Sequence, residues 1–242
     1  MKVFLIGLMV FIHLGLNAQS FYFGPKLGPT AGFQRWENFQ QSPIFTYHGA
    51  FFVESYSKEN SQNALYAQLG WHNRGSAYRN QRQFTIEGDL ITIPTRNFQF
   101  SNLVLAVGGK RKQQITKKSN TYYFIGLRGE YTVMTNLHKF EQFNQYYNSF
   151  FYPDDLFVKK LNYGISAGGG IEFKHSKYVW SFIEVGIHPD LSRQYEQPPL
   201  GNVVNPWNPG SIMTLQERRI KNITLEVSFG LKFFREVIYL NY

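Results

Sequence analysis

The chain alternates between apolar and polar residues over unusually long stretches. In residues 223–233 the odd positions are all apolar, and the even positions include Glu226 and Lys232. An extended backbone sends successive side chains to opposite faces, so this pattern predicts a strand with one apolar face and one polar face. A helix would scatter Glu226 and Lys232 among the apolar side chains, and we therefore exclude a helix here.

Seven further stretches repeat the pattern. The clearest are 121–133, 161–173 and 179–188, and weaker versions occupy 21–36, 44–56, 63–78 and 97–109. Globular strands usually have about five or six residues, whereas a tilted strand that crosses a bilayer needs about 9–11. The length of these stretches predicts an all-β fold, an eight-stranded antiparallel up-and-down transmembrane β-barrel.

The predicted links between strands alternate in length. Short or strongly polar links follow the second, fourth and sixth strands, and mostly longer links follow the others. The short links are 57–62, 110–119 and 174–177, and the longer ones are 37–43, 80–96, 135–158 and 193–216. Outer-membrane barrels have short periplasmic turns and long outer loops. We therefore expect both termini on the periplasmic side.

Residues 1–18 predict a cleaved signal peptide. Lys2 precedes an apolar run from Val3 to Leu16, and Ala18 offers a small residue before Gln19. The run is too short for a membrane-spanning helix, and no other segment has 18 consecutive apolar residues. We expect residues 19–242 to form one exported barrel that is integral to the outer membrane.

Composition narrows the chemistry. The chain has no cysteine, which excludes a lipid-modified cysteine, a disulfide scaffold and thiolate metal sites. Its formal net charge is +9, and much of this charge is local. We interpret one basic segment as a solvated periplasmic turn, formed by Lys110, Arg111, Lys112, Lys117 and Lys118. An exported protein does not routinely meet nucleic acid, so outer-membrane lipid or another envelope protein is the expected partner.

Alternation does not say which face points inward. A soluble barrel would enclose its apolar face around an apolar ligand, whereas a membrane barrel turns that face outward. The polar face here is rich in glycine and carries both charge signs, which suits a crowded interior of paired charges. The predicted lumen network consists of Lys26, Glu54, Arg128, Glu130, Glu172, Glu184, Glu226 and Lys232. Eight strands leave room only for side chains, so we expect a packed plug and no wide pore.

Histidines do not define a metal site in the sequence. Three histidines fall at the alternating positions whose side chains are predicted to point into the lumen, but they belong to separate predicted strands. They are His48, His72 and His188. Spacing across separate strands is not constrained by sequence, so hydrogen-bonded lumen histidines explain the pattern better than metal ligands. We expect neither a metal nor another cofactor.

Catalytic motifs are also missing from the sequence. A lipid-modifying enzyme would need a serine and a histidine near the lipid-facing surface. Ser55, Ser101 and Ser181 have outward parity, but none of the histidines in the predicted strands does, and there is no G-x-S-x-G motif. We therefore expect a protein that is not an enzyme.

The two long outer loops are the best candidates for a binding surface. Aromatic and proline-rich loops on a rigid scaffold are suited to contacts with a protein or glycan. The equal alternative is that they fold over the barrel mouth as a lid. The candidate partner-binding residues are Phe143, Tyr146, Tyr147, Phe150, Phe151, Tyr152 and Trp207.

The strand motifs resemble the small outer-membrane barrels of Bacteroidota, the PorT-like group. The resemblance covers nearly all of the mature chain. It lies in Ala18-Gln19, in Phe23-Gly24-Pro25-Lys26-Leu27-Gly28, in Gly126-Leu127-Arg128-Gly129-Glu130-Tyr131, in Tyr163-Gly164-Ile165-Ser166-Ala167-Gly168-Gly169-Gly170, and in the last strand. It implies an outer-membrane location and, for some members, a role in type IX protein secretion.

The last strand also resembles a recognition signal for barrel assembly. Ser228, Gly230 and Phe233 follow the pattern, whereas Arg235 stands where a second aromatic residue is expected. The strand is therefore predicted to end at Phe234 or to continue to Tyr242.

Three functions follow from these observations. We favour a non-enzymatic barrel that is a structural or accessory component of an envelope or secretion complex. The alternatives are a lipid-modifying outer-membrane enzyme and a soluble exported barrel that binds an apolar ligand.

Overall fold

The fold is seen in a computed structural model of the chain. The structure describes residues 20–37, 41–57, 62–80, 82–84, 89–92, 94–146, 152–205, 208 and 210–237. The predicted signal peptide, residues 1–18, lies outside the described residues.

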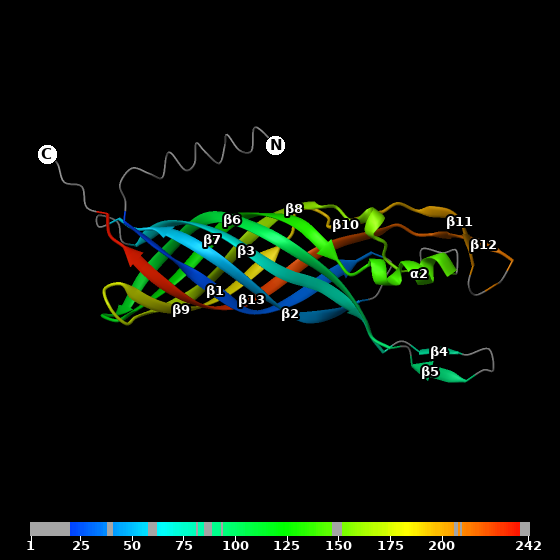
Figure 1. Ribbon diagram of the computed structural model, residues 1–242, viewed down its shortest axis with the longest axis horizontal. Coiled ribbons are helices and arrows are strands. Elements are labelled where there is room, and N and C mark those ends of the chain that lie inside the picture. The colour runs from blue at the N-terminus through cyan, green and yellow to red at the C-terminus, as the bar shows by residue number, and fades with distance from the viewer. Residues whose placement is uncertain are drawn as a thin grey trace, which may run out of the picture.

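Eight long strands form a closed antiparallel ring, in the order β1-β2-β3-β6-β7-β8-β9-β13, and β13 pairs with β1 (Figure 1). The strands are β1 Phe21–Trp36, β2 Ser42–Ser55, β3 Asn63–Tyr78, β6 Arg96–Thr116, β7 Ser119–Thr135, β8 Leu161–Lys174, β9 Val179–Pro189 and β13 Arg218–Arg235. The predicted all-β, eight-stranded barrel is confirmed. The last strand ends at Arg235, one residue beyond Phe234, the earlier of its two predicted ends.

The three long connections between strands all lie at one end of the barrel. Short connections join β2 to β3, β6 to β7 and β8 to β9, and they lie at the end where β1 begins and β13 ends (Figure 1). We call this the turn end. The four others, of which three are long, lie at the opposite end, the loop end.

The loop end contains elements that periodicity did not predict. They are the hairpin β4–β5 (Arg82–Phe84 and Leu90–Thr92), α2 (His138–Tyr146), η1 (Asp155–Phe157), β10 (Tyr195–Gln197) and the hairpin β11–β12 (Leu200–Val204 and Ile212–Leu215). β10 pairs with β13 beyond the point where β9 stops. The two hairpins project away from the barrel (Figure 1).

The apolar face of the ring points outward. Leu65, Ile125 and Leu127 are about two thirds exposed, at 70%, 64% and 66%. On β13 the outward apolar residues run from Ile223 to Phe233. With a rise of about 3.3 Å per residue and a tilt of about 45°, this belt is roughly 25 Å tall, the height of the apolar band of outer-membrane barrels. A soluble barrel that encloses its apolar face is therefore excluded.

None of the described helices is both long and apolar enough to span a bilayer.

Close approach at the β1–β13 seam explains two of the glycines. A Cβ atom at Gly24 would lie 2.0 Å from the Leu231 carbonyl oxygen, and one at Gly28 would lie 1.8 Å from the Val227 carbonyl oxygen. No side chain fits at such distances without a backbone shift, so glycine is required where the ring closes.

The outward apolar belt predicts a depth-dependent cost of charge. Leu127 lies midway along the outward face of β7, and Tyr123 lies near its turn end. We expect Leu127→Arg to lower the free energy of unfolding in phospholipid vesicles by about 2–4 kcal/mol, and Tyr123→Arg by about 0–1 kcal/mol. Denaturant titration followed by tryptophan fluorescence measures both. Equal costs for the two variants would contradict a lipid-facing belt.

Candidate functional site

Buried ion pairs fill the half of the lumen nearer the turn end. Lys232 on β13 lies at the centre, with its Nζ 2.9 Å from Glu54 Oε1 and 2.6 Å from Glu172 Oε1. Lys110 Nζ lies 3.0 Å from Glu54 Oε2, and Lys112 pairs with Glu54 as well. Glu54, Glu172 and Lys232 are at most 2% exposed. A carboxylate this deeply buried needs several donors, and these lysines supply them.

A second group of contacts adjoins this one. Lys26 Nζ lies 2.6 Å from Glu184 Oε1, and the Tyr122 hydroxyl donates a 2.8 Å hydrogen bond to Glu184 Oε2. The Lys110 ammonium lies 4.2 Å from the centre of the Tyr122 ring. Phe182 packs in the same buried aromatic cluster, so the charges here are surrounded by rings and are shielded from water.

The half of the lumen nearer the loop end is built on two arginines. Arg74 Nη2 lies 2.5 Å from Glu130 and its Nη1 lies 2.9 Å from Asp190. Arg128 contacts the same two carboxylates, each at 2.8 Å. The guanidinium group presents donors in a rigid fork, so two arginines can hold two carboxylates in a fixed square.

Three histidines surround Glu226 just beside this square. His72 Nδ1 lies 2.9 Å from Glu226 Oε1, His188 Nε2 lies 3.3 Å from Oε2, and His48 Nε2 lies 4.0 Å from Oε2. His48 also hydrogen-bonds Thr30. Within the described residues no group of three or more His, Cys, Asp or Glu side chains is arranged to hold a metal ion.

The acidic side chains and the lysine and arginine side chains in the ionic part of the lumen are equal in number, and Arg218, which is also buried, lies at the loop end outside this part. The six acidic residues are Glu54, Glu130, Glu172, Glu184, Asp190 and Glu226, and the six basic residues are Lys26, Arg74, Lys110, Lys112, Arg128 and Lys232. All eight predicted network residues lie in this set. Seven of them pair with a charge of opposite sign, and Glu226 contacts the three histidines instead. Sequence reasoning missed Arg74, Lys110, Lys112 and Asp190. The alternation of faces in a strand could have identified Arg74, because it lies two residues beyond His72 in the same strand and therefore points to the same side.

Two small pockets lie between these groups. One is lined by His48, His72, His188 and Glu226 among others, and the other is lined by Tyr66, Phe124 and Phe182 among others. Lys26 borders both pockets.

Neutral polar side chains form the next layer toward the loop end. Gln194 enters the barrel mouth from the segment between β9 and β10 and donates to Asn102 Oδ1 at 3.1 Å. Asn222 donates to Gln194 Oε1 at 2.9 Å and to Asp190 Oδ2 at 2.7 Å. This layer links the ionic lumen to the apolar groups above it.

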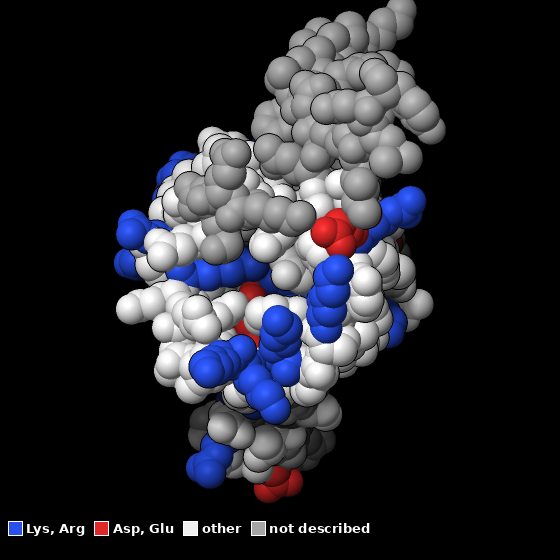
Figure 2. Space-filling view, turned by 90° about the vertical axis from the view of Figure 1, so that its left-hand side faces the viewer, with Lys and Arg blue, Asp and Glu red and all other residues white. Residues whose placement is uncertain are grey.

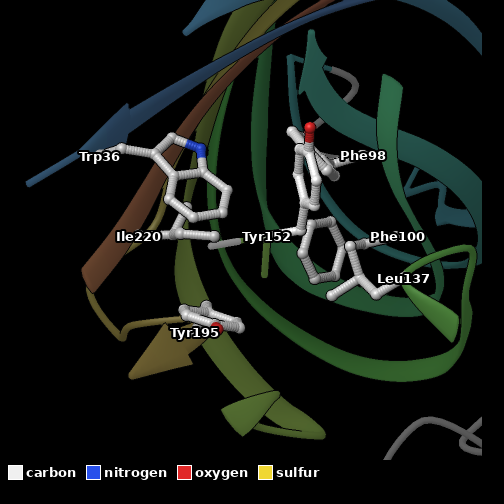
Figure 3. Packing of buried hydrophobic residues seen from close by; sticks show 7 residues of the cluster. All are labelled: Trp36, Phe98, Phe100, Leu137, Tyr152, Tyr195 and Ile220. Atoms are coloured by element: carbon white, nitrogen blue, oxygen red, sulfur yellow. The ribbon is translucent and has the colours of Figure 1, made fainter. Parts of the chain in front are cut away.

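An apolar cluster closes the loop end of the lumen. Figure 3 shows its side chains converging from opposite walls of the barrel mouth. The cluster consists of Trp36, Phe98, Phe100, Leu137, Tyr152, Tyr195 and Ile220. The Tyr195 hydroxyl donates to Gln197 at 2.9 Å, and burial raises the pKa of Tyr195, so the hydroxyl stays neutral.

The predicted partner-binding residues of the loop 135–158 are only partly described. Tyr152 is 8% exposed and belongs to the apolar cluster, with its backbone held by the Asn144 side chain. This burial favours the alternative that the loop folds over the barrel mouth as a lid, and partner binding by Tyr152 stays a prediction. The main chains of Phe143 and Tyr146 belong to α2. Their side chains lie outside the described residues, as do Tyr147, Phe150, Phe151 and Trp207 in full.

The predicted basic turn 110–119 is shorter than expected. β6 continues to Thr116, so Lys110, Arg111 and Lys112 belong to a strand, and the turn itself is Lys117 and Lys118. Lys110 and Lys112 point into the lumen, whereas Arg111 is exposed. The prediction failed because a run of cations has the same composition in a turn and in a strand with a charged lumen face.

One contact near the turn end joins a serine and a histidine. His175 Nε2 lies 2.7 Å from Ser181 Oγ at an exposed position. Ser181 points outward between Phe173 and Leu231, which pair with it in register. Parity could not predict this contact, because His175 lies in the turn between β8 and β9.

Comparison with known proteins supports the fold and adds no closer relationship. No family model matches the chain, and no curated protein matches it. Among solved structures, the chain is similar to the outer membrane protein OprG of Pseudomonas aeruginosa, with a TM-score of 0.52 and 8% identity over 89% of this chain and 96% of that one.

Two further structures are less similar. They are Ail of Yersinia pestis in complex with the heparin analogue sucrose octasulfate (TM-score 0.40, 9% identity, 89% and 99% covered) and the outer membrane protease OmpT of Escherichia coli (TM-score 0.45, 8% identity, 90% and 98% covered). At these identities the comparisons show the fold alone. The chain has the fold of the small outer-membrane β-barrel proteins, and its exposed apolar belt is the surface that this fold presents to lipid.

The ion-pair lumen predicts a large cost for removing one central charge. Lys232→Met leaves Glu54 and Glu172 short of a buried partner, and we expect the free energy of unfolding to fall by about 3–5 kcal/mol. Adding Glu172→Gln should restore part of the loss, because it removes one unpaired charge. The matched control is Lys159→Gln, which breaks the half-exposed pair with Glu196 and should cost less than about 1 kcal/mol. Equal losses for Lys232→Met and Lys159→Gln in urea titrations would refute a tightly paired lumen.

Proposed function

We propose that the chain is a non-enzymatic integral outer-membrane barrel that serves as an accessory subunit of an envelope or secretion complex. The observation that carries this proposal is the occupied lumen. Five buried carboxylates pair with six cations inside the ring, Glu226 contacts three histidines, and an apolar cluster covers the loop end. An interior filled in this way serves as a rigid core, so the proposed activity resides on the outside of the barrel.

The two projecting hairpins are the proposed contact elements. The hairpin β4–β5 exposes Leu90 at 51%, and the hairpin β11–β12 exposes Ile212 at 67%. Both extend from the rigid ring at the loop end (Figure 1). Mobile or projecting segments on a rigid scaffold are where binding residues concentrate. The resemblance to the PorT-like group supports a secretion complex as the assembly, and type IX secretion as the route.

Site-specific cross-linking tests this proposal. A photo-reactive amino acid at Leu90 or Ile212 should give discrete protein adducts in intact outer membranes. The same probe at Leu127 in the lipid-facing belt is the control and should give no protein adduct from that surface. Isolation as a lone monomer in mild detergent, with no adduct from either hairpin, would contradict an accessory subunit.

A second candidate function rests on the Ser181–His175 contact. A hydrogen-bonded serine and histidine at an exposed site beside apolar belt residues is the pair that hydrolysis of a lipid ester requires. Within the described part of the chain no carboxylate is paired with His175, so a third member that would orient the ring is not seen. This gap is the reason that the accessory role is the preferred function.

Lipid analysis distinguishes the two candidates. The purified protein in phospholipid vesicles is expected to release no fatty acid, as measured by mass spectrometry. Release that disappears in Ser181→Ala and persists in Ser55→Ala, a second outward-facing serine, would establish the hydrolase and overturn the non-enzymatic proposal.

A further inference from the structure

The turn end carries a concentrated positive charge. Six exposed cations lie there, and we call them the basic rim: Arg111, Lys117, Lys118, Lys174, Lys177 and Arg235. Figure 2 looks onto this end and shows blue side chains spread across it with few red ones. Within the described residues, Glu236 is the carboxylate that pairs with this rim, through Lys177 at 3.0 Å.

The loop end differs in its charge pattern. There, exposed cations such as Lys139 and Lys159 alternate with carboxylates such as Glu141 and Asp155. Arg219 contacts Glu217 and Glu37, and Arg193 contacts Glu196. Mixed charges of this kind neutralise one another locally, whereas the basic rim produces a field of one sign.

Aromatic side chains place the basic rim at the depth of lipid headgroups. Arg111 pairs in register with Tyr123, which is 59% exposed on the outward face. The Lys177 ammonium lies 5.3 Å from the ring centre of Tyr178, which is 53% exposed. Exposed aromatic rings beside an apolar belt mark the boundary between hydrocarbon and headgroups. The cations next to them therefore lie where phosphates would lie.

We infer that the basic rim binds the phosphate groups of anionic phospholipids in the leaflet that the turn end faces. Lysine and arginine attract anionic headgroups when they lie within a Debye length of the membrane surface. The arrangement fits a lipid better than a soluble acidic partner, because the cations follow the aromatic boundary of the belt. This inference rests on the membrane insertion that the proposed function includes.

Lipid selectivity in vesicles tests the inference. The full mature chain is reconstituted in phosphatidylcholine vesicles that contain a trace of spin-labelled phosphatidylglycerol or, separately, spin-labelled phosphatidylcholine. Electron paramagnetic resonance then gives the relative association constant of the two lipids from the motionally restricted fraction. We expect phosphatidylglycerol to be preferred roughly fivefold or more, and expect salt to reduce this preference.

Two matched variants locate the selectivity. The ratio of the phosphatidylglycerol to the phosphatidylcholine association constant should fall close to one in a variant of the basic rim. This variant carries Lys117→Gln, Lys118→Gln, Lys174→Gln and Lys177→Gln together. The control replaces four exposed lysines of the loop end, Lys139, Lys159, Lys160 and Lys221, by glutamine and should keep the ratio of the unchanged chain. Inorganic phosphate should lower the preference no more than sodium chloride does at equal ionic strength, because the ligand is the lipid.

The outcomes are distinct. A ratio of one for the unchanged chain, or an equal loss in both variants, overturns the inference and leaves membrane insertion intact. A ratio of one together with binding of a polyglutamate peptide to the basic rim would assign the rim to an acidic protein. Absence of any motionally restricted lipid would show that the chain does not insert, which is a failure of the proposed function itself.

Discussion

The constraint on which this structure depends is that backbone hydrogen bonds have no water to replace them in hydrocarbon. Each strand must therefore have a partner on both sides, and the ring has to close. Here β13 meets β1 along nearly the full length of β1. Closure with eight strands sets a narrow interior, and the glycines at the seam are a direct result, because no side chain fits between Gly28 and the Val227 carbonyl group. The outward apolar belt and the filled lumen both follow from this geometry.

A narrow interior that is shut off from water can hold charge only in pairs. The lumen meets this requirement with five carboxylates that contact lysines or arginines from strands far apart in the sequence, and with Glu226, which contacts three histidines. Polarity then falls in steps toward the loop end, from ion pairs through the amides of Asn102, Gln194 and Asn222 to the rings around Trp36. Because the interior is occupied in this way, the two ends of the barrel are the surfaces left for partners. The loop end offers projecting hairpins, and the turn end offers cations.

Strict alternation made the ring predictable from the sequence. Period two placed Glu54, Glu130 and Lys232 on one face, and they lie in the lumen. Alternation does not distinguish a charged strand from a polar turn when most residues of a segment are polar. Lys110 and Lys112 fall at the positions of β6 whose side chains point into the lumen, but a run of cations is equally typical of a solvated turn.

Residues outside the regular strands were beyond the reach of periodicity. Asp190 follows the last residue of β9, where the chain turns into the barrel mouth, and its contacts with Arg74 and Arg128 depend on that turn. Tyr152 shows a different limit, since aromatic enrichment in a loop is the same for a lid and for a binding surface. The contact between His175 and Ser181 depends on the shape of a four-residue turn, which composition does not specify.

The position of Lys232 has a consequence for how the barrel is made. This residue lies on the last strand, yet it bridges Glu54 and Glu172, which are 178 and 60 residues earlier in the chain. Any intermediate that lacks the final strand contains these two carboxylates without one of the two cations that they share, the other being Lys112. The charge of such an intermediate is less completely compensated, which disfavours its insertion into lipid and links insertion to the arrival of the last strand.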